Sequence, residues 1–402
     1  MRSRSLPLAL VLLGLGCNKA PTRPPDPPVQ RPEPARVEAP PAGQAAEPDV
    51  DLPLAKLKLP PGFKIGIYAS DVEDARSMAL SPAGTLYVGT RSKGKLYAIP
   101  DANHDQTGDR VVTLASGLDM PNGVVFHDGS LYVAEHERLV RYDHVEEAVA
   151  STRAEELTLP KPTVVRGGYP DDDEHGWKYL RLGPDNKLYV PIGAPCNICD
   201  PKSPYASITR VGLDGKGHEV FARGVRNSVG FDWHPRSKEL WFTENGRDRM
   251  GDDIPGDELN RAPKAGLHFG YPYCHQGDTL DPEFGKPDAC KKATPPERVL
   301  APHVAALALR FYEGKMFPED YRHQILIAEH GSWNRSTPLG YRLMRVQLDA
   351  QDKPTSYEVF VEGWLQEGKA WGRPVDLLVM PDGALLVSDD EADVIYRITY
   401  AG

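Results

Sequence analysis

One pattern of apolar and polar positions recurs through residues 76–400. In each copy an apolar stretch runs into a turn rich in Pro, Asp, Gly or Asn, and a second apolar run of the Leu-Tyr-Val kind follows. Short apolar runs on either side of such a turn are typical of β-hairpins. The clear copies span residues 77–88, 123–133, 179–190, 229–242 and 376–387, and a degenerate copy spans 309–328.

A third short apolar run usually follows each hairpin, as at 95–99, 139–142, 208–213, 341–346 and 394–398. Repeated units of three or more strands predict an all-β chain folded as a six-bladed β-propeller. A β-sandwich is the alternative, but it does not explain six copies of one hairpin. We expect residues 63–68 to complete the last blade and close the ring, and residues 244–305 to form an elaborated loop.

The first seventeen residues resemble a targeting segment. Two arginines precede an apolar run at residues 6–15, which is too short to span a bilayer. Gly16-Cys17 then resembles a bacterial lipobox, although Gly14 stands where Leu is usual. We therefore expect a lipoprotein-type signal peptide over 1–17 and an exported protein, lipid-anchored and facing the periplasm or cell exterior. An ordinary signal peptide is the alternative.

Residues 18–56 are rich in proline and poor in large apolar residues. Such a composition cannot form a core and stays extended, so we predict a disordered linker between the anchor and a head at 57–402. The formal net charge of −10, with no block of Lys or Arg, argues against a nucleic-acid partner. The membrane is expected to be contacted through the lipid anchor alone.

Four cysteines remain if Cys17 carries lipid. An even number in an exported protein indicates disulfides, and proximity favours Cys196 with Cys199 and Cys274 with Cys290. A metal or redox role for the Cys196-x-x-Cys199 pair is the alternative. Neither pair is followed by His in a CxxCH pattern, so no c-type haem is expected on this chain.

A propeller gathers the starts of its innermost strands around one end of a central channel. The polar residues before the hairpins are therefore candidates for a binding site, and they are Arg76, Asn122, His175, Arg226, Asn227 and Arg373. Because arginine grips carboxylates through paired hydrogen bonds, this set suits a planar ligand with several negative charges. The alternative is that strand ends at a solvent face are commonly polar.

Four ordered blocks resemble the soluble glucose/sorbosone dehydrogenase family over roughly residues 57–400. They are His175 ahead of Gly183-Pro-Asp185, the run Gly224-Val-Arg-Asn-Ser-Val-Gly-Phe231, the pair Glu244-Asn-Gly-Arg247 and Asp257-Glu-Leu-Asn260, and Gly372-Arg-Pro-Val-Asp376. The segment Ser332-Trp-Asn-Arg335 is more similar to the sorbosone and fungal pyranose dehydrogenase branches than to the glucose enzymes.

This resemblance implies an oxidoreductase that uses pyrroloquinoline quinone (PQQ) and Ca²⁺. Such an enzyme oxidises a sugar at its anomeric or aldehyde carbon by hydride transfer to PQQ, and a separate cytochrome or quinone takes the electrons. The resemblance implies His175 as the general base with Glu174 beside it, Arg226, Asn227, Arg373, Arg76 and Arg335 as PQQ contacts, and the carbonyls of Gly246 and Arg247 as calcium ligands. In one departure from the family, Val375 replaces an arginine of the last block.

A second calcium site is suggested by spacing. Asp101, Asn103, Asp105 and Asp109 have the alternation of a calcium loop, but Gln106 replaces its glycine and Val112 its terminal glutamate. A structural Ca²⁺ between blades and a solvated turn both remain open.

Two other functions stay in view. A calcium-dependent lactonase-like hydrolase would hold its metal with carboxylates and Asn in the channel, whereas the strand starts here offer Arg and His. A non-catalytic propeller that binds a partner is favoured by Val375 and by the altered segment 329–335, which could mean that the cofactor site has been lost.

Overall fold

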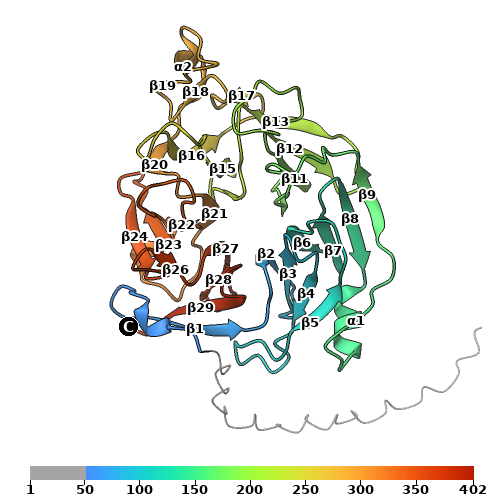
Figure 1. Cartoon of the computed structure of the whole chain (residues 1–402). Coiled ribbons are helices and arrows are strands. Elements are labelled where there is room, and N and C mark those ends of the chain that lie inside the picture. The colour runs from blue at the N-terminus through green and yellow to red at the C-terminus, as the bar shows by residue number, and fades with distance from the viewer. Residues whose placement is uncertain (1–50) are drawn as a thin grey trace, which may run out of the picture. The chain divides into compact units, whose positions relative to one another are not determined.

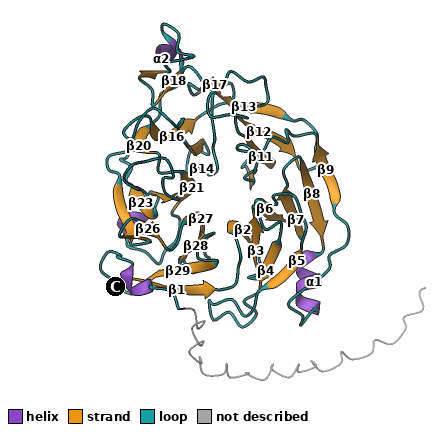
Figure 2. Cartoon of the chain, viewed as in Figure 1, coloured by secondary structure: helices purple, strands orange, loops and turns teal. Residues whose placement is uncertain are grey.

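The computed structural model describes residues 51–402, which form six large sheets arranged as the blades of a propeller (Figures 1 and 2). The prediction of an all-β six-bladed propeller is therefore confirmed. The predicted signal peptide, Cys17 and most of the predicted linker lie outside the described residues. Among residues 51–402 no helix is both long and apolar enough to cross a membrane.

The first three blades follow the chain in order. The first comprises β2 (Ala75–Leu80), β3 (Leu86–Thr90), β4 (Leu96–Ile99) and β5 (Val112–Ala115). The second comprises β6 (Gly123–His127), β7 (Ser130–Ala134), β8 (Arg138–Asp143) and β9 (Thr163–Gly167), with α1 (Val145–Ser151) between β8 and β9. The third comprises β10 (Arg181–Leu182), β11 (Lys187–Ile192), β12 (Ser207–Gly212) and β13 (Glu219–Arg223), extended by β17 (Leu267–His268).

The last three blades complete the ring. The fourth comprises β14 (Phe231–Trp233), β15 (Leu240–Glu244), β16 (Gly256–Ala262) and β20 (Arg298–Pro302). The fifth comprises β21 (Ala306–Phe311), β22 (Ile325–Glu329), β23 (Arg342–Val346) and β24 (Glu358–Glu362), with η2 (Glu319–Tyr321) between β21 and β22. The sixth comprises β27 (Pro374–Val379), β28 (Leu385–Asp389), β29 (Val394–Tyr400) and β1 (Phe63–Ala69).

The N-terminal strand closes the ring as the sequence predicts. β1 pairs antiparallel with β29, with Phe63 opposite Tyr400 and Ile67 opposite Tyr396. Apolar side chains then pack between neighbouring blades, as where Leu86 of the first blade joins Leu386 of the sixth. The core is thus divided among the interfaces between blades, which leaves the starts of the inner strands available for polar residues.

Buried carboxylates also join neighbouring blades to each other. Asp376 on β27 accepts a hydrogen bond from the Met78 backbone N–H on β2 at 2.9 Å. Asp257 on β16 accepts one from the Ala306 backbone N–H on β21 at 3.1 Å. The first bond joins the innermost strands of two blades, and the second joins β16 of the fourth blade to the innermost strand of the fifth. Both bonds hold neighbouring blades in fixed relative positions.

Two boundaries differ from expectation. Residues 244–305 are not one loop, because β16 and β20 within them form the outer half of the fourth blade. The insertion proper carries β18 (Cys274–His275), β19 (Thr279–Leu280) and α2 (Ala289–Lys292), and a further hairpin, β25 (Leu365–Gln366) with β26 (Lys369–Ala370), follows the fifth blade. The head also begins before residue 57: η1 (Leu54–Lys56) lies within the predicted linker, and Leu52 and Leu54 pack against the core.

Candidate active site

A cavity of about 280 Å³ lies where the inner strands begin. The structure brings together at this cavity Arg76, His175, Arg226, Asn227, Gly246 and Arg373, all of them candidates from the sequence. They come from four different blades. All but Gly246, which follows β15, lie at or just before the start of an innermost strand, as expected. Asn122 lies behind the wall, where its side-chain oxygen accepts a hydrogen bond from Arg76 Nε at 3.1 Å.

His175 is held in one tautomer by its surroundings. Its Nδ1 lies 2.7 Å from the carbonyl oxygen of Ala194. Since a carbonyl can only accept, Nδ1 must carry the proton, and Nε2 of the neutral ring keeps its lone pair. Burial, reinforced by the positive charge of Arg226, lowers the pKa of His175 to about 3. The neutral imidazole is therefore the form present at physiological pH.

The backbone around His175 is equally constrained. His175 has a positive φ of 56°, a conformation that few residues with side chains adopt. Its side chain lies directly over Gly193, where a Cβ atom would come within 2.4 Å of the His175 Cβ. Gly193 follows β11, so the end of that strand provides the surface on which the imidazole rests.

Arg226 is bound on several sides at the cavity wall. Its guanidinium donates to the Asn197 carbonyl at 2.9 Å and to the Asn197 side-chain oxygen at 3.0 Å. It also donates to the Asn245 carbonyl at 3.2 Å and forms an ion pair with Asp248 at 3.0 Å. These contacts hold the guanidinium in one orientation, which suits recognition of a charged planar ligand.

Two further arginines are fixed in a similar way. Arg373 donates to the carbonyls of His330 and Gly331 at 3.2 and 3.1 Å. Arg76 is almost fully buried and pairs with Asp390 at 2.7 Å. Asp390 also binds His330 Nε2 at 2.7 Å. Only part of each guanidinium is used by these protein contacts, so donors remain for a ligand.

Gly246 lines the cavity, and its position depends on Asp257. The Gly246 backbone N–H donates to Asp257 Oδ1 at 3.0 Å. Burial raises the pKa of Asp257 to about 6. The Arg247 side chain turns away and pairs with Asp281. Its carbonyl, like that of Gly246, remains a predicted calcium ligand.

Several predicted residues lie away from the cavity. Arg335 is not part of the lining, because its guanidinium donates to the carbonyl of Asp252, so the predicted PQQ contact is not supported by its position. Glu174 is exposed to solvent. Val375, which replaces the family's arginine, is buried beside Val229 and Leu307, and Leu307 lines the cavity.

The Asp101 loop is organised by its own side chains. Asp109 accepts a hydrogen bond from the Ala102 N–H at 2.7 Å, and Asp105 accepts one from the Thr107 N–H at 2.9 Å. Asp101 accepts one from the Gln106 N–H at 3.1 Å. Within residues 51–402 no three His, Cys, Asp or Glu side chains gather as a metal-binding group. The structural Ca²⁺ at this loop stays a prediction.

Sequence reasoning missed part of the lining. Arg91 stacks over Trp177 at 4.5 Å from the ring centre, and both line the cavity. Asn334 donates to Asp248 Oδ1 at 2.7 Å, which joins the fifth blade to the Arg226 site. Asn334 could have been named from the Ser332–Arg335 motif. Arg91 follows the end of a strand, and no sequence motif marks it as a site residue. Further lining residues are His303, His330 and Trp333.

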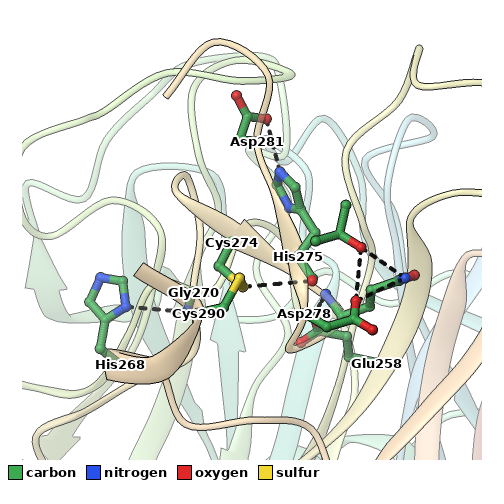
Figure 3. Close-up of a disulfide and its surroundings, with 10 residues drawn as sticks. Glu258, His268, Gly270, Cys274, His275, Asp278, Asp281 and Cys290 are labelled. Carbon is green, nitrogen blue, oxygen red and sulfur yellow. Dashed lines mark hydrogen bonds and ion pairs between the residues drawn. A yellow bond between two sulfur atoms is a disulfide. The ribbon is translucent and has the colours of Figure 1, made fainter. Parts of the chain in front are cut away.

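Both disulfides predicted from proximity are present. The Cys274–Cys290 disulfide lies in the insertion of the fourth blade and links β18 to α2 (Figure 3). In the same insertion His275 binds Asp281 at 2.9 Å (Figure 3). Cys196–Cys199 instead closes a short turn next to Arg226.

The arrangement favours binding of an anion beside a neutral base. Within the described chain, the lining carries Arg76, Arg91, Arg226 and Arg373 against Asp248 and Asp257. Buried polar atoms without a protein partner in residues 51–402 include Trp177 Nε1 and the side-chain oxygens of Asn245 and Asn334, all on lining residues. Such atoms are expected to bind a ligand or water.

A sequence relative spans most of the chain. An uncharacterised protein of Borreliella burgdorferi is 33% identical over 351 residues, which cover 86% of this chain and 91% of that protein.

Solved structures with the same fold include three sugar-enzyme structures. A calcium structure of a Trichoderma reesei carbohydrate-active enzyme of family AA12 superposes with a TM-score of 0.72 at 20% identity, covering 86% of this chain and 97% of that one. The holo PQQ domain of pyranose dehydrogenase from Coprinopsis cinerea gives 0.70 at 19% identity, covering 85% and 97%. PQQ-bound aldose sugar dehydrogenase from Streptomyces coelicolor gives 0.60 at 21% identity, covering 85% and 99%.

A family model covers nearly the whole head. The description TrAA12-like matches residues 57–401, which are nearly all of the described chain. The resemblance to PQQ-dependent sugar dehydrogenases that the sequence motifs indicate is confirmed by this match, and the chain belongs to the TrAA12-like family.

Proposed function

We propose that this protein is a PQQ-dependent oxidoreductase that oxidises a sugar at its anomeric or aldehyde carbon. The observation that carries the proposal is the geometry of His175, whose Nε2 lone pair is available at a cavity lined by four arginines. Family membership and the enzymes that share the fold support the same reaction class.

The cavity residues fit PQQ, a planar quinone with three carboxylates. Arg76, Arg226 and Arg373 approach the cavity from three blades, so they can meet carboxylates at different edges of one flat ligand. Arg91 on Trp177 adds a fourth cation beside an aromatic face. When bound, PQQ supplies a two-electron acceptor for the hydride of the sugar.

We propose that Ca²⁺ is held by the carbonyls of Gly246 and Arg247. Calcium prefers oxygen ligands of this kind, and it would supply a Lewis acid that polarises the quinone. Support comes from Asp257, which fixes the Gly246 N–H at 3.0 Å and so orients the peptide that follows. The separate acceptor, a cytochrome or quinone, and the lipid anchor in an exported protein are proposed on the sequence alone.

His175 acts as the general base in this scheme. Its Nε2 removes the proton of the sugar hydroxyl while Ala194 holds Nδ1–H, so the ring keeps its orientation as it becomes charged. Carboxylates bound at the arginines offset the charge of Arg226. They therefore raise the pKa of His175 from about 3 towards the range of an efficient base. We further propose that Glu174, the exposed neighbour, assists in tuning the ring.

The test is a titration of the metal-stripped protein with PQQ, with and without Ca²⁺, followed by a panel of sugars and an electron-accepting dye. We expect calcium-dependent binding and bleaching of the quinone spectrum by at least one sugar. His175→Ala should abolish turnover yet retain PQQ. Absence of binding at micromolar PQQ would overturn the proposal and favour a binding scaffold, and normal turnover in the variant would overturn the assignment of the base.

A further inference from the structure

The turn closed by Cys196–Cys199 lies against the guanidinium of Arg226. Asn197 within this turn makes four hydrogen bonds. Its backbone oxygen accepts from Arg226 Nε at 2.9 Å, and its side-chain oxygen accepts from Arg226 Nη2 at 3.0 Å. The same side-chain oxygen accepts from the Asp248 N–H at 2.8 Å, and the side-chain amide donates to the Asp248 carbonyl at 3.1 Å. Asn197 therefore joins Arg226 and Asp248 into one unit.

These bonds decide how Arg226 can be used. A guanidinium has five N–H donors, and the contacts with Asn197, Asn245 and Asp248 occupy four of them. They hold the side of the group that faces the protein, while Arg226 itself lines the cavity. An arginine fixed in this way loses little side-chain entropy when an anion binds, which improves affinity.

The disulfide keeps Asn197 in place. The turn has little regular structure, and its other anchor is the hydroxyl of Tyr271, which accepts from the Cys199 N–H at 3.1 Å. Ala194, two residues before this turn, contacts both groups: its N–H donates to the Arg226 carbonyl at 2.8 Å, and its carbonyl accepts from His175. One short segment thus sets the positions of both the cation and the base.

We propose that Asn197 is a positioning residue for Arg226, and that the Cys196–Cys199 bond serves the cavity by holding Asn197 in the orientation that fixes this guanidinium. The identity of the anion, PQQ, rests on the proposed function. We call this arrangement of Asn197, Arg226 and the Cys196–Cys199 disulfide the clamp. The clamp is inferred from the contacts of this chain alone.

Three variants test the clamp. Asn197→Ala removes the side-chain bonds, and the double change C196A/C199A releases the turn. The double change C274A/C290A is the matched control, because that disulfide lies in the insertion and its cysteines do not line the cavity. PQQ dissociation constants are measured by fluorescence quenching, and thermal unfolding of each variant is recorded. We expect the first two variants to bind PQQ about tenfold or more weakly, as for loss of bonds to a charged group, while the control loses thermal stability and keeps its affinity.

A second readout needs no PQQ. The imidazole C–H resonance of His175 is titrated by NMR in the same proteins. When Arg226 is released, its charge moves away from the ring, so the titration midpoint of His175 should rise in N197A and in C196A/C199A but not in the control. Unchanged PQQ affinity together with an unchanged midpoint in N197A would overturn the clamp. If the wild-type protein binds no PQQ, the proposed function fails, and the midpoint alone still decides on the clamp.

Discussion

A methyl group added at Gly193 should inactivate the enzyme without releasing its cofactor. The Cβ of an alanine there would lie 2.4 Å from the Cβ of His175 and 3.0 Å from its carbonyl oxygen. Ordinary contacts begin near 3.4 Å, so the imidazole must move by about 1 Å. Displacement of a catalytic group by about 1 Å can reduce turnover about a hundredfold.

The same change also strains the fold. Overpacking of this kind costs roughly 1–3 kcal/mol in the free energy of unfolding. We therefore expect Gly193→Ala to lower kcat about a hundredfold at saturating PQQ, with the PQQ dissociation constant nearly unchanged, because the arginines do not move. The assay combines dye-coupled sugar oxidation, PQQ titration and urea denaturation.

Gly167→Ala is the matched control, since an added Cβ at Gly167 meets no atom within 4 Å. This variant should keep wild-type kcat and stability. The reasoning would be refuted if Gly193→Ala retained full kcat although its free energy of unfolding fell by the expected amount. The variant would then be strained without displacement of His175.

Three further predictions concern charge. In the PQQ-free protein His175 should titrate by NMR near pH 3 rather than 6.5, and Arg226→Gln should raise the midpoint; a wild-type midpoint near 6.5 contradicts the assigned environment. The imidazole of His175 takes up its proton at higher pH in the unfolded chain than in the folded one. The free energy of unfolding should therefore fall as the pH drops from 6.5 towards 3. His175→Asn should remove this part of the pH dependence, measured by urea denaturation at a series of pH values. Arg373→Ala should weaken PQQ binding about tenfold to a hundredfold, as for a hydrogen-bonded charge, while the exposed control Arg223→Ala should not; equal affinities in a PQQ titration would place the carboxylate contact elsewhere.

The hairpin repeat made the fold readable from the sequence. Alternating apolar runs around a turn report a local property, since each strand pairs with its neighbour in the chain, as β2 with β3 and β27 with β28. Ring closure by β1 followed from an unpaired apolar run before the first copy. The repeat failed in the fourth blade, where β16 carries Asp257 and Glu258, because buried carboxylates hide a strand from any pattern of apolar residues.

Part of the candidate site was determined in the same way. Residues that precede inner strands converge because the fold superposes the starts of those strands, and so Arg76, Arg226 and Arg373 could be named in advance. That rule does not specify which side chains point into the channel. Asn122 precedes an inner strand but supports Arg76 from behind the cavity wall. Arg335, which only the family resemblance suggested, binds the Asp252 carbonyl and does not line the cavity.

The tertiary structure alone decided what holds the site together. The sequence showed Cys196 and Cys199 as a pair, but not that Asn197 between them binds Arg226, which lies in a different loop. Nor could it show that Ala194 fixes the tautomer of His175 or that Asn334 reaches Asp248. Such contacts depend on how loops of different blades meet, and the local pattern of apolar residues carries no information about the distance between those loops. The repeated hairpin is therefore enough to predict the blades from the sequence. The contacts that orient the cavity residues depend on the tertiary structure, because they join loops of different blades.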